Sequence, residues 1–135
     1  MYCPEFTWSV EDERRTHEEV RGHQRLKNGN NNGENVCGAY VVMRMCIQNN
    51  INCDLKGFPF DELWTSPWQL RDFINRYTDY ESTQETFSKG QFEAYVEMIK
   101  AEIDKGNPCI ILIDWGLLKY HYVNVVGYKE DCLLI

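Results

Sequence analysis

The sequence predicts an α+β domain in which helical segments come first and strands come last. Two observations support this prediction. Up to Lys105, apolar residues recur at the three- and four-residue spacing of amphipathic helices, whereas after Gly106 they form short apolar runs typical of buried strands. The short links between these runs indicate antiparallel neighbours. We therefore expect the helices to pack on a C-terminal antiparallel sheet.

The composition limits the class of protein. The chain has 135 residues, of which 43% are hydrophobic, enough for one compact domain with a core. Its formal net charge of −7 disfavours a nucleic-acid-binding protein, because such proteins present a basic surface to phosphates. We find neither a membrane-spanning apolar run nor a signal peptide, and we expect a cytoplasmic protein or one exported without such a peptide.

Residues 1–30 form a charged N-terminal segment, which we separate from a domain at residues 31–135. Residues 1–8 are expected to be irregular, and Ser9 can cap a helix with an acidic first turn. The apolar anchors of that helix are few: Val10, Val20 and Leu26. So sparse a pattern is typical of a solvated helix; a linker or a partner-binding arm are the alternatives.

Three helices are predicted inside the domain. The first, Cys37–Gln48, is apolar nearly all round, as in a buried central helix. The second begins with a capping box between Ser66 and Gln69 around Pro67. It continues with an apolar stripe: Leu70, Phe73, Ile74 and Tyr77. The third, from about Gln91 to Lys105, has the stripe Phe92, Tyr95, Val96, Ile99 and Ile103.

The third helix is terminated by Gly106 and Pro108, and three strands follow. We expect them at Cys109–Trp115, at His121–Tyr128 and from Cys132 to Ile135.

The six cysteines predict no metal site and no cofactor. Several lie in apolar runs, where a free thiol packs as a small hydrophobe, so we expect mostly reduced thiols. Cys3, Cys46 and Cys53 do not combine with the histidines into a zinc spacing. The loop at Lys27–Asn35 lacks the acidic ligands that calcium requires, and no Gly-rich phosphate loop follows a strand.

Cys37 is the candidate nucleophile, because it stands where a Gly/Asn-rich loop meets the central helix. A helix N-terminus favours the thiolate, and the backbone N–H of Cys37 could donate to a developing oxyanion. Gly38 beside it would let a substrate carbonyl approach closely.

His121 is the candidate proton acceptor, since His17 and His23 lie in the charged segment. By strand alternation it shares a face with Val123 and Val125. A lone cysteine or histidine is most often structural, and the joint occurrence of Cys37 and His121 in this order is what favours catalysis.

Three segments resemble one family. They are "VCGAY" at Val36–Tyr40, "GNPCIILIDW" at Gly106–Trp115 and "HYVNVVGY" at His121–Tyr128, the last being the most specific. They resemble the papain-like cysteine peptidases, most closely the C39-like (peptidase C39) branch, over about Asn31 to the C-terminus. The resemblance implies a papain-like fold with the nucleophile at the start of the central helix. It also implies a thiol protease in which Cys37 attacks an amide carbonyl and His121 is the general base.

The remaining site residues follow from the same resemblance. The family usually has an oxyanion-donating Gln shortly before its cysteine; here Asn31, six residues before Cys37, is the candidate and Gln24 the alternative. The residue that orients His121 would be Asp114 or, less favourably placed, Asp131. Asn124 lies on the opposite strand face by alternation.

Two interpretations are open for Trp115, Trp64 and Trp68. They line a substrate cleft, or they are packing residues that are buried in the core or half-buried. Two alternatives to a peptidase stay open. The same dyad could serve a deamidase or an acyl-transferring bacterial toxin or effector, or the domain could be degenerate and bind a protein. The expected partners are a peptide or protein substrate and, for a toxin, a cognate inhibitor or immunity protein.

Overall fold

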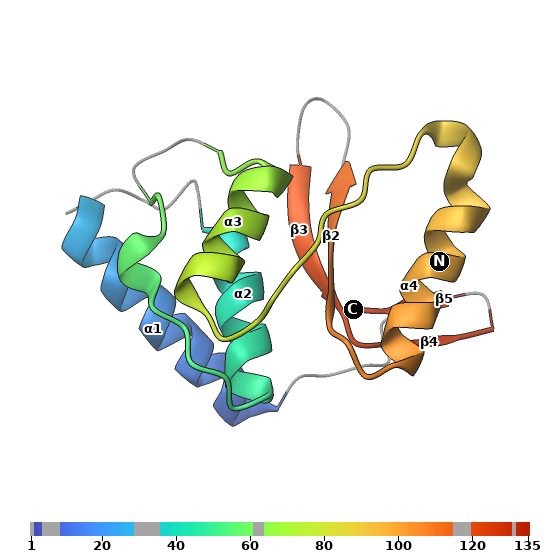
Figure 1. The fold of residues 1–135 in the computed structure, drawn as a ribbon. Helices are drawn as coiled ribbons and strands as arrows, with labels where there is room; N and C mark the ends of the chain where they lie inside the picture. Colours follow the sequence, from blue (N-terminus) through green and yellow to red (C-terminus); the bar gives the residue numbers. More distant parts are fainter. Residues whose placement is uncertain (1, 4–8, 29–35, 61–63, 115–119, 131) are drawn as a thin grey trace. The chain divides into compact units, whose positions relative to one another are not determined.

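The structure, a computed structural model, describes residues 2–3, 9–28, 36–60, 64–114, 120–130 and 132–135. The chain divides into two compact units. The helical unit is Trp8–Gln84, and the sheet unit combines Met1–Thr7 with Glu85–Ile135. Helices precede most of the strands along the chain, so the α+β class is confirmed (Figure 1).

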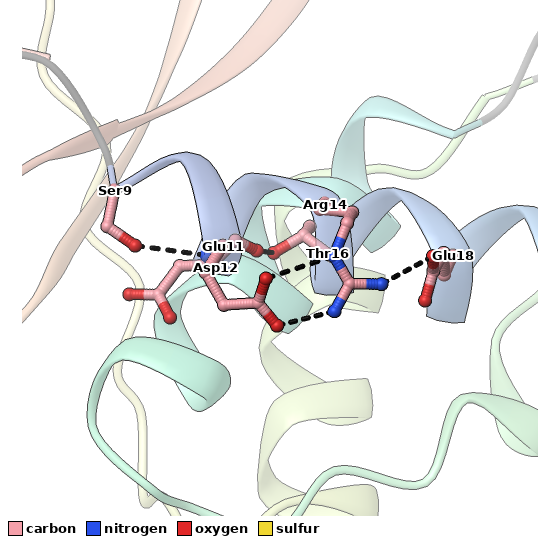
Figure 2. A network of polar contacts seen from close by, with 6 residues as sticks. All are labelled: Ser9, Glu11, Asp12, Arg14, Thr16 and Glu18. Carbon is pink, nitrogen blue, oxygen red and sulfur yellow. Dashed lines mark hydrogen bonds and ion pairs between the residues drawn. The ribbon is translucent and has the colours of Figure 1, made fainter.

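The helical unit begins with α1, Val10–Asn28. The Ser9 hydroxyl accepts a hydrogen bond from the Asp12 N–H at 3.0 Å, which confirms the predicted cap. Figure 2 shows how Arg14 then ties two turns together, because its guanidinium pairs with Glu11 on one side and with Glu18 on the other. These pairs lie on the exposed surface of the helix.

α1 is largely solvated, as expected, yet it buries a narrow stripe at four-residue spacing: Thr16, Val20 and Gln24. Two of these three residues are polar, so counting apolar anchors could not find the stripe. The helix packs against α2, Cys37–Gln48, rather than serving as a linker (Figure 1). The prediction of a buried central helix at Cys37–Gln48 is confirmed, since most of α2 is buried.

The helical unit is completed by the short helix η1, Leu55–Gly57, and by α3, Pro67–Tyr77. The capping box is confirmed: Gln69 N–H donates to Ser66 Oγ at 3.2 Å and Ser66 N–H donates to Gln69 Oε1 at 2.8 Å. The predicted stripe buries Leu70, Phe73 and Ile74. Its aromatic members also make ring contacts in the core of this unit, where Phe73 meets Phe58 edge-on and stacks on Tyr77.

The sheet unit contains the short helix η2, Lys89–Gln91, and α4, Phe92–Asp104. α4 ends in a Schellman motif: Asn107 N–H donates to Glu102 O and Gly106 N–H to Ile103 O, both at 2.9 Å. Gly106 has φ +82°, a conformation that glycine adopts without strain, which explains why the helix ends there. Phe92 was expected in the buried stripe and is instead 51% exposed, because it stands in the first turn of α4.

The strands form two separate sheets. β2, Cys109–Asp114, pairs antiparallel with β3, Tyr120–Val125. The other sheet has the order β1-β5-β4, from Tyr2–Cys3, Cys132–Leu134 and Gly127–Lys129. β1 runs parallel to β5, so the expectation that residues 1–8 are irregular is wrong at Tyr2–Cys3.

The expectation of one strand over His121–Tyr128 is also wrong. The strand breaks at Val126, whose N–H donates to Leu134 O at 2.8 Å and so turns the chain from one sheet into the other. The core of the sheet unit spans both sheets and α4; its buried members are Ile99, Ile111, Val125 and Leu133. Among the described helices, none combines the length and the apolar character needed to cross a bilayer.

Candidate active site

Cys37 is the first residue of α2 and is partly exposed. Its thiol is free. Val36 precedes it with φ −120° and ψ −17°, and its carbonyl accepts the first helical hydrogen bond from Tyr40 N–H at 2.9 Å. In the described part of the chain no side chain caps this N-terminus, and the first turn contains no acidic residue. Such an end leaves backbone N–H groups available to an acceptor that approaches along the helix axis.

Gly38 is buried beside Cys37. A Cβ atom added to it would lie 3.2 Å from Phe58 Cζ and 3.3 Å from Leu70 Cδ1. Because Gly38 has no side chain, the first turn of α2 can lie close to Leu70 of α3 and to Phe58. This packing role explains the glycine without any reference to a substrate, whereas the predicted role in admitting a carbonyl stays a prediction.

His121 is the second residue of β3 and is exposed. It pairs with Ile113 of β2, and its neighbours two and four residues on, Val123 and Val125, belong to the core of the sheet unit. The adjacent residues Tyr122 and Asn124 are buried, with exposed fractions of 3% and 5%. The two-residue period of a strand puts Asn124 on the opposite face of β3 from His121.

The predicted orienting and cleft residues are only partly covered by the structure. Asp114 is the last residue of β2 and pairs with Tyr120, so the residue opposite His121 is Ile113. Asp131, Asn31 and Trp115 lie outside the described residues. The two other tryptophans, Trp64 and Trp68, are 44% and 55% exposed, so neither belongs to the core and both are about half-buried.

Gln24 has an unusual environment. Its side chain is 3% exposed, and Oε1 accepts a hydrogen bond from Arg21 Nη1 at 2.8 Å. Nε2, by contrast, is buried and has no hydrogen-bond partner within the described chain. A buried donor without a partner costs about 1–3 kcal/mol, so such groups are rare in native proteins. The sequence offered Gln24 only as an alternative, because burial of a polar residue on a charged helix leaves no local signal.

The contacts between α1 and α2 indicate where Gln24 lies. Arg44 pairs with Glu13, and Tyr40 shares a hydrogen bond of 2.7 Å with His17 Nδ1, so the two helices run antiparallel. Each turn forward along α1 thus moves one turn back along α2. Gln24 belongs to the turns of α1 beyond His17, towards the N-terminal end of α2 where Cys37 stands.

The structure thus groups Cys37, Gly38 and Gln24 in the helical unit, and His121, Asp114 and Asn124 in the sheet unit. Among the described residues, no three His, Cys, Asp or Glu side chains are grouped to hold a metal ion. The thiol of Cys109 in β2 is free, and burial raises its pKa to about 11, helped by the carboxylate of Glu102. Cys46 and Cys53 are also free, as expected, whereas Cys132 is disulfide-bonded.

Comparison with known proteins returns no protein family, no curated protein and no solved structure that matches this chain.

Proposed function

We propose that the chain is a papain-like cysteine hydrolase that cleaves a peptide or amide bond, with Cys37 as nucleophile and His121 as general base. The observation that favours it is the position of Cys37. It is a free, partly exposed thiol on the first residue of a buried helix, and no described side chain caps that helix. His121 is exposed near the start of its strand, where a side chain can meet a substrate.

In this reaction the Cys37 sulfur attacks the substrate carbonyl while its proton passes to His121. The carbonyl oxygen becomes an oxyanion, which the free N–H groups at the start of α2 would stabilise. The protonated His121 then gives its proton to the leaving amine, and a thioester remains on Cys37. Water, deprotonated by His121, hydrolyses the thioester and restores the free thiol.

We assign the second oxyanion donor to Gln24. Its Oε1 is held by Arg21, which leaves Nε2 as the unpaired donor. A buried donor that lacks a partner before substrate binds gains one when the oxyanion forms, which is differential stabilisation of the transition state. Arg21 is itself fixed by Tyr40 of α2, since its Nε donates to the Tyr40 hydroxyl at 3.1 Å.

The experiment is covalent trapping of the full chain with a peptide vinyl sulfone, a probe that reacts with activated thiols. We expect the probe to modify Cys37 in preference to the free thiols of Cys46, Cys53 and Cys109, because none of these three stands at a helix N-terminus. Cys37→Ser should abolish the labelling, and His121→Asn should slow it. His23→Asn, a change of a histidine on α1, is the matched control and should leave the rate unchanged.

Equal labelling of several cysteines, or an unchanged rate in His121→Asn, would contradict the proposal. The products decide between the reaction types that share the dyad. Cleavage of a peptide library gives new termini, whereas a deamidase changes a side-chain amide to an acid and leaves the backbone intact. A folded chain that binds peptides without trapping the probe would instead indicate the degenerate, binding form of the domain.

A further inference from the structure

A chain of hydrogen bonds connects α1 with α2 and ends at Gln24. At its outer end, His17 Nδ1 lies 2.7 Å from the Tyr40 hydroxyl oxygen. The same oxygen accepts a hydrogen bond from Arg21 Nε at 3.1 Å, and Arg21 Nη1 donates to Gln24 Oε1 at 2.8 Å. Only Tyr40 belongs to α2, so the chain of bonds crosses between the two helices at one hydroxyl group.

The chemistry of the groups fixes the direction of each bond. A guanidinium group has donors and no acceptor, so the atom of Gln24 that faces Arg21 is the amide oxygen. The Tyr40 oxygen accepts from Arg21 Nε, and its single proton is available to His17 Nδ1, which accepts it when the imidazole carries its own proton on Nε2. The Gln24 amide therefore cannot turn over without losing its hydrogen bond from Arg21.

The fixed amide oxygen determines where the amide nitrogen points. Oε1 and Nε2 are the two branches of one planar group, so Nε2 of Gln24 faces away from Arg21 Nη1. Gln24 is 3% exposed, and no described atom accepts a hydrogen bond from Nε2. An unpaired buried donor is costly, and a free amide would turn to find an acceptor. Arg21 thus holds the amide in an orientation that the surroundings of Nε2 do not reward.

The register of the two helices indicates what lies near this donor. The contacts Glu13–Arg44 and His17–Tyr40 are four residues apart on each helix, in opposite directions. One more turn of α1 reaches the level at which α2 starts, and Gln24 lies beyond that level. Helical side chains lean towards the N-terminus of their own helix, so the side chain of Gln24 leans back towards the start of α2.

We propose that Arg21, Tyr40 and His17 are positioning residues for the oxyanion donor. They hold the amide of Gln24 so that Nε2 faces the start of α2 before substrate binds. This inference rests on the proposed function, because a positioned donor contributes to catalysis only if Cys37 attacks a carbonyl. A donor that is already in place needs no reorientation when the oxyanion forms, so the positioning residues should affect the chemical step and leave substrate binding unchanged.

The positioning role requires an arginine at residue 21. Its Nε and Nη1 donate to groups on two different helices, which a planar guanidinium can do because its donors diverge at fixed angles. The group also lies over the Tyr40 ring, with Cζ 5.7 Å from the ring centroid. A lysine keeps the positive charge but has one nitrogen, which cannot reproduce this fork. Arg21→Lys therefore separates the positioning role from the charge.

The kinetic test uses the full chain and the peptide that it cleaves fastest in the library that tests the proposed function. We expect Arg21→Lys to lower kcat about 10-fold with little change in KM, because the amide of Gln24 is present but no longer held. Tyr40→Phe should lower kcat about 3-fold, since it removes the hydroxyl that orients Arg21. Adding Arg21→Lys to Gln24→Leu should lower kcat no further, because positioning has no effect once the donor is gone.

Arg25→Lys is the matched control. Arg25 is an exposed arginine of the same helix, and its Nε donates to a backbone carbonyl within α1. The same change of side chain there should leave kcat and KM unaltered. Thermal unfolding of every variant checks that the chain is folded at the temperature of the assay.

A second readout requires no turnover. In a chain with 15N in its glutamine side chains, the pair of amide resonances that is missing from Gln24→Leu belongs to Gln24. Its order parameter should be high in the unaltered chain and in Arg25→Lys, and it should fall in Arg21→Lys and in Tyr40→Phe. A purely structural role of Arg21 in joining the two helices would lower the thermal midpoint without this selective loss of order.

Two results would overturn the positioning role. One is an amide of Gln24 that stays equally ordered in Arg21→Lys, and the other is a loss of kcat that adds fully to the loss in Gln24→Leu. Failure of the hydrolase itself is a different result, in which the unaltered chain neither cleaves the library nor reacts with the vinyl sulfone at Cys37. In that case the catalytic role falls with the hydrolase, even if the amide still responds to Arg21→Lys.

Discussion

Arg44 of α2 and Glu13 of α1 form a two-pronged ion pair across the helix interface. Arg44 Nε donates to Glu13 Oε1 at 2.5 Å, and Nη2 donates to Oε2 at 3.3 Å. The Arg44 side chain is only 19% exposed, whereas Arg14, which pairs within α1, is 52% exposed. Because partial burial reduces screening by water, the interhelical pair should contribute more to stability than the pair on the surface.

A pair of double-mutant cycles tests this difference. We expect a coupling energy of about 1 kcal/mol between Glu13 and Arg44, from the free energies of urea unfolding of Glu13→Ala, Arg44→Ala and the double variant. The control cycle on Arg14 and Glu18, the exposed pair of Figure 2, should give about 0.5 kcal/mol or less. Equal coupling in the two cycles would contradict the argument from burial.

Two glycines of the helical unit should respond to alanine with opposite signs. At Gly38 a Cβ would press on Phe58 and Leu70, and we expect Gly38→Ala to lower the unfolding free energy by about 1–2 kcal/mol. Gly22 of α1 has no neighbour within 4 Å of its Cβ position, and Gly22→Ala should raise stability by about 0.5–1 kcal/mol through helix propensity. Denaturant titrations of both variants check the signs, and a stabilised Gly38→Ala would disprove the packing role.

Cys109 should resist alkylation in the folded chain. Burial raises the pKa of its thiol from the ordinary 9.0 to about 11, so at pH 8 iodoacetamide should react about 100-fold more slowly with Cys109 in the folded chain than in the urea-unfolded chain. The folded chain keeps a proton that the unfolded chain loses. This contribution to stability is therefore complete below pH 9 and disappears as the pH rises towards 11. Peptide mapping of alkylation rates against pH measures the shift, and equal rates in the two states would refute it.

Gln24 should show a trade-off between stability and activity. Gln24→Leu removes the unpaired buried Nε2, so the unfolding free energy should stay the same or rise by about 1 kcal/mol, despite the lost bond from Arg21. If Nε2 donates to the oxyanion, kcat should fall about 100-fold while KM changes little. Gln24→Glu keeps an acceptor for Arg21 but removes the donor, and it should lose kcat as well. A variant that loses stability and keeps kcat would show a purely structural glutamine.

The helices could be predicted from the sequence because the residues that specify them lie within or next to each helix. The capping residues Ser9 and Ser66 and the apolar run Cys37–Gln48 each specify structure within a few residues. The buried stripe of α1 could not be predicted from the sequence, because Thr16 and Gln24 are polar and no neighbouring residue indicates that they are buried. Burial of a polar residue depends on which helix packs against it, and that is a tertiary property.

The sequence could predict strands only where the two paired strands are close together along the chain. The β2-β3 hairpin follows from two adjacent apolar runs, whereas the break at Val126 lies inside an uninterrupted run and depends on Leu134. β1 pairs with a strand at the other end of the sequence and has no local signal at all. For the candidate site, residue types and order suggested Cys37 and His121, but spacing in sequence cannot specify the environment of Gln24.

The parallel pairing of β1 with β5 has a consequence for biosynthesis. Since Tyr2–Cys3 belongs to the sheet unit, the helical unit is nested within the chain of that unit. A ribosome delivers all of Trp8–Gln84 before it delivers any of β2 to β5. The nested part can therefore acquire its core during translation, whereas β1 has to wait for its partner until β5 has been synthesised. Vectorial synthesis thus imposes an order of assembly in which β1, although synthesised before the helical unit, is fixed after it.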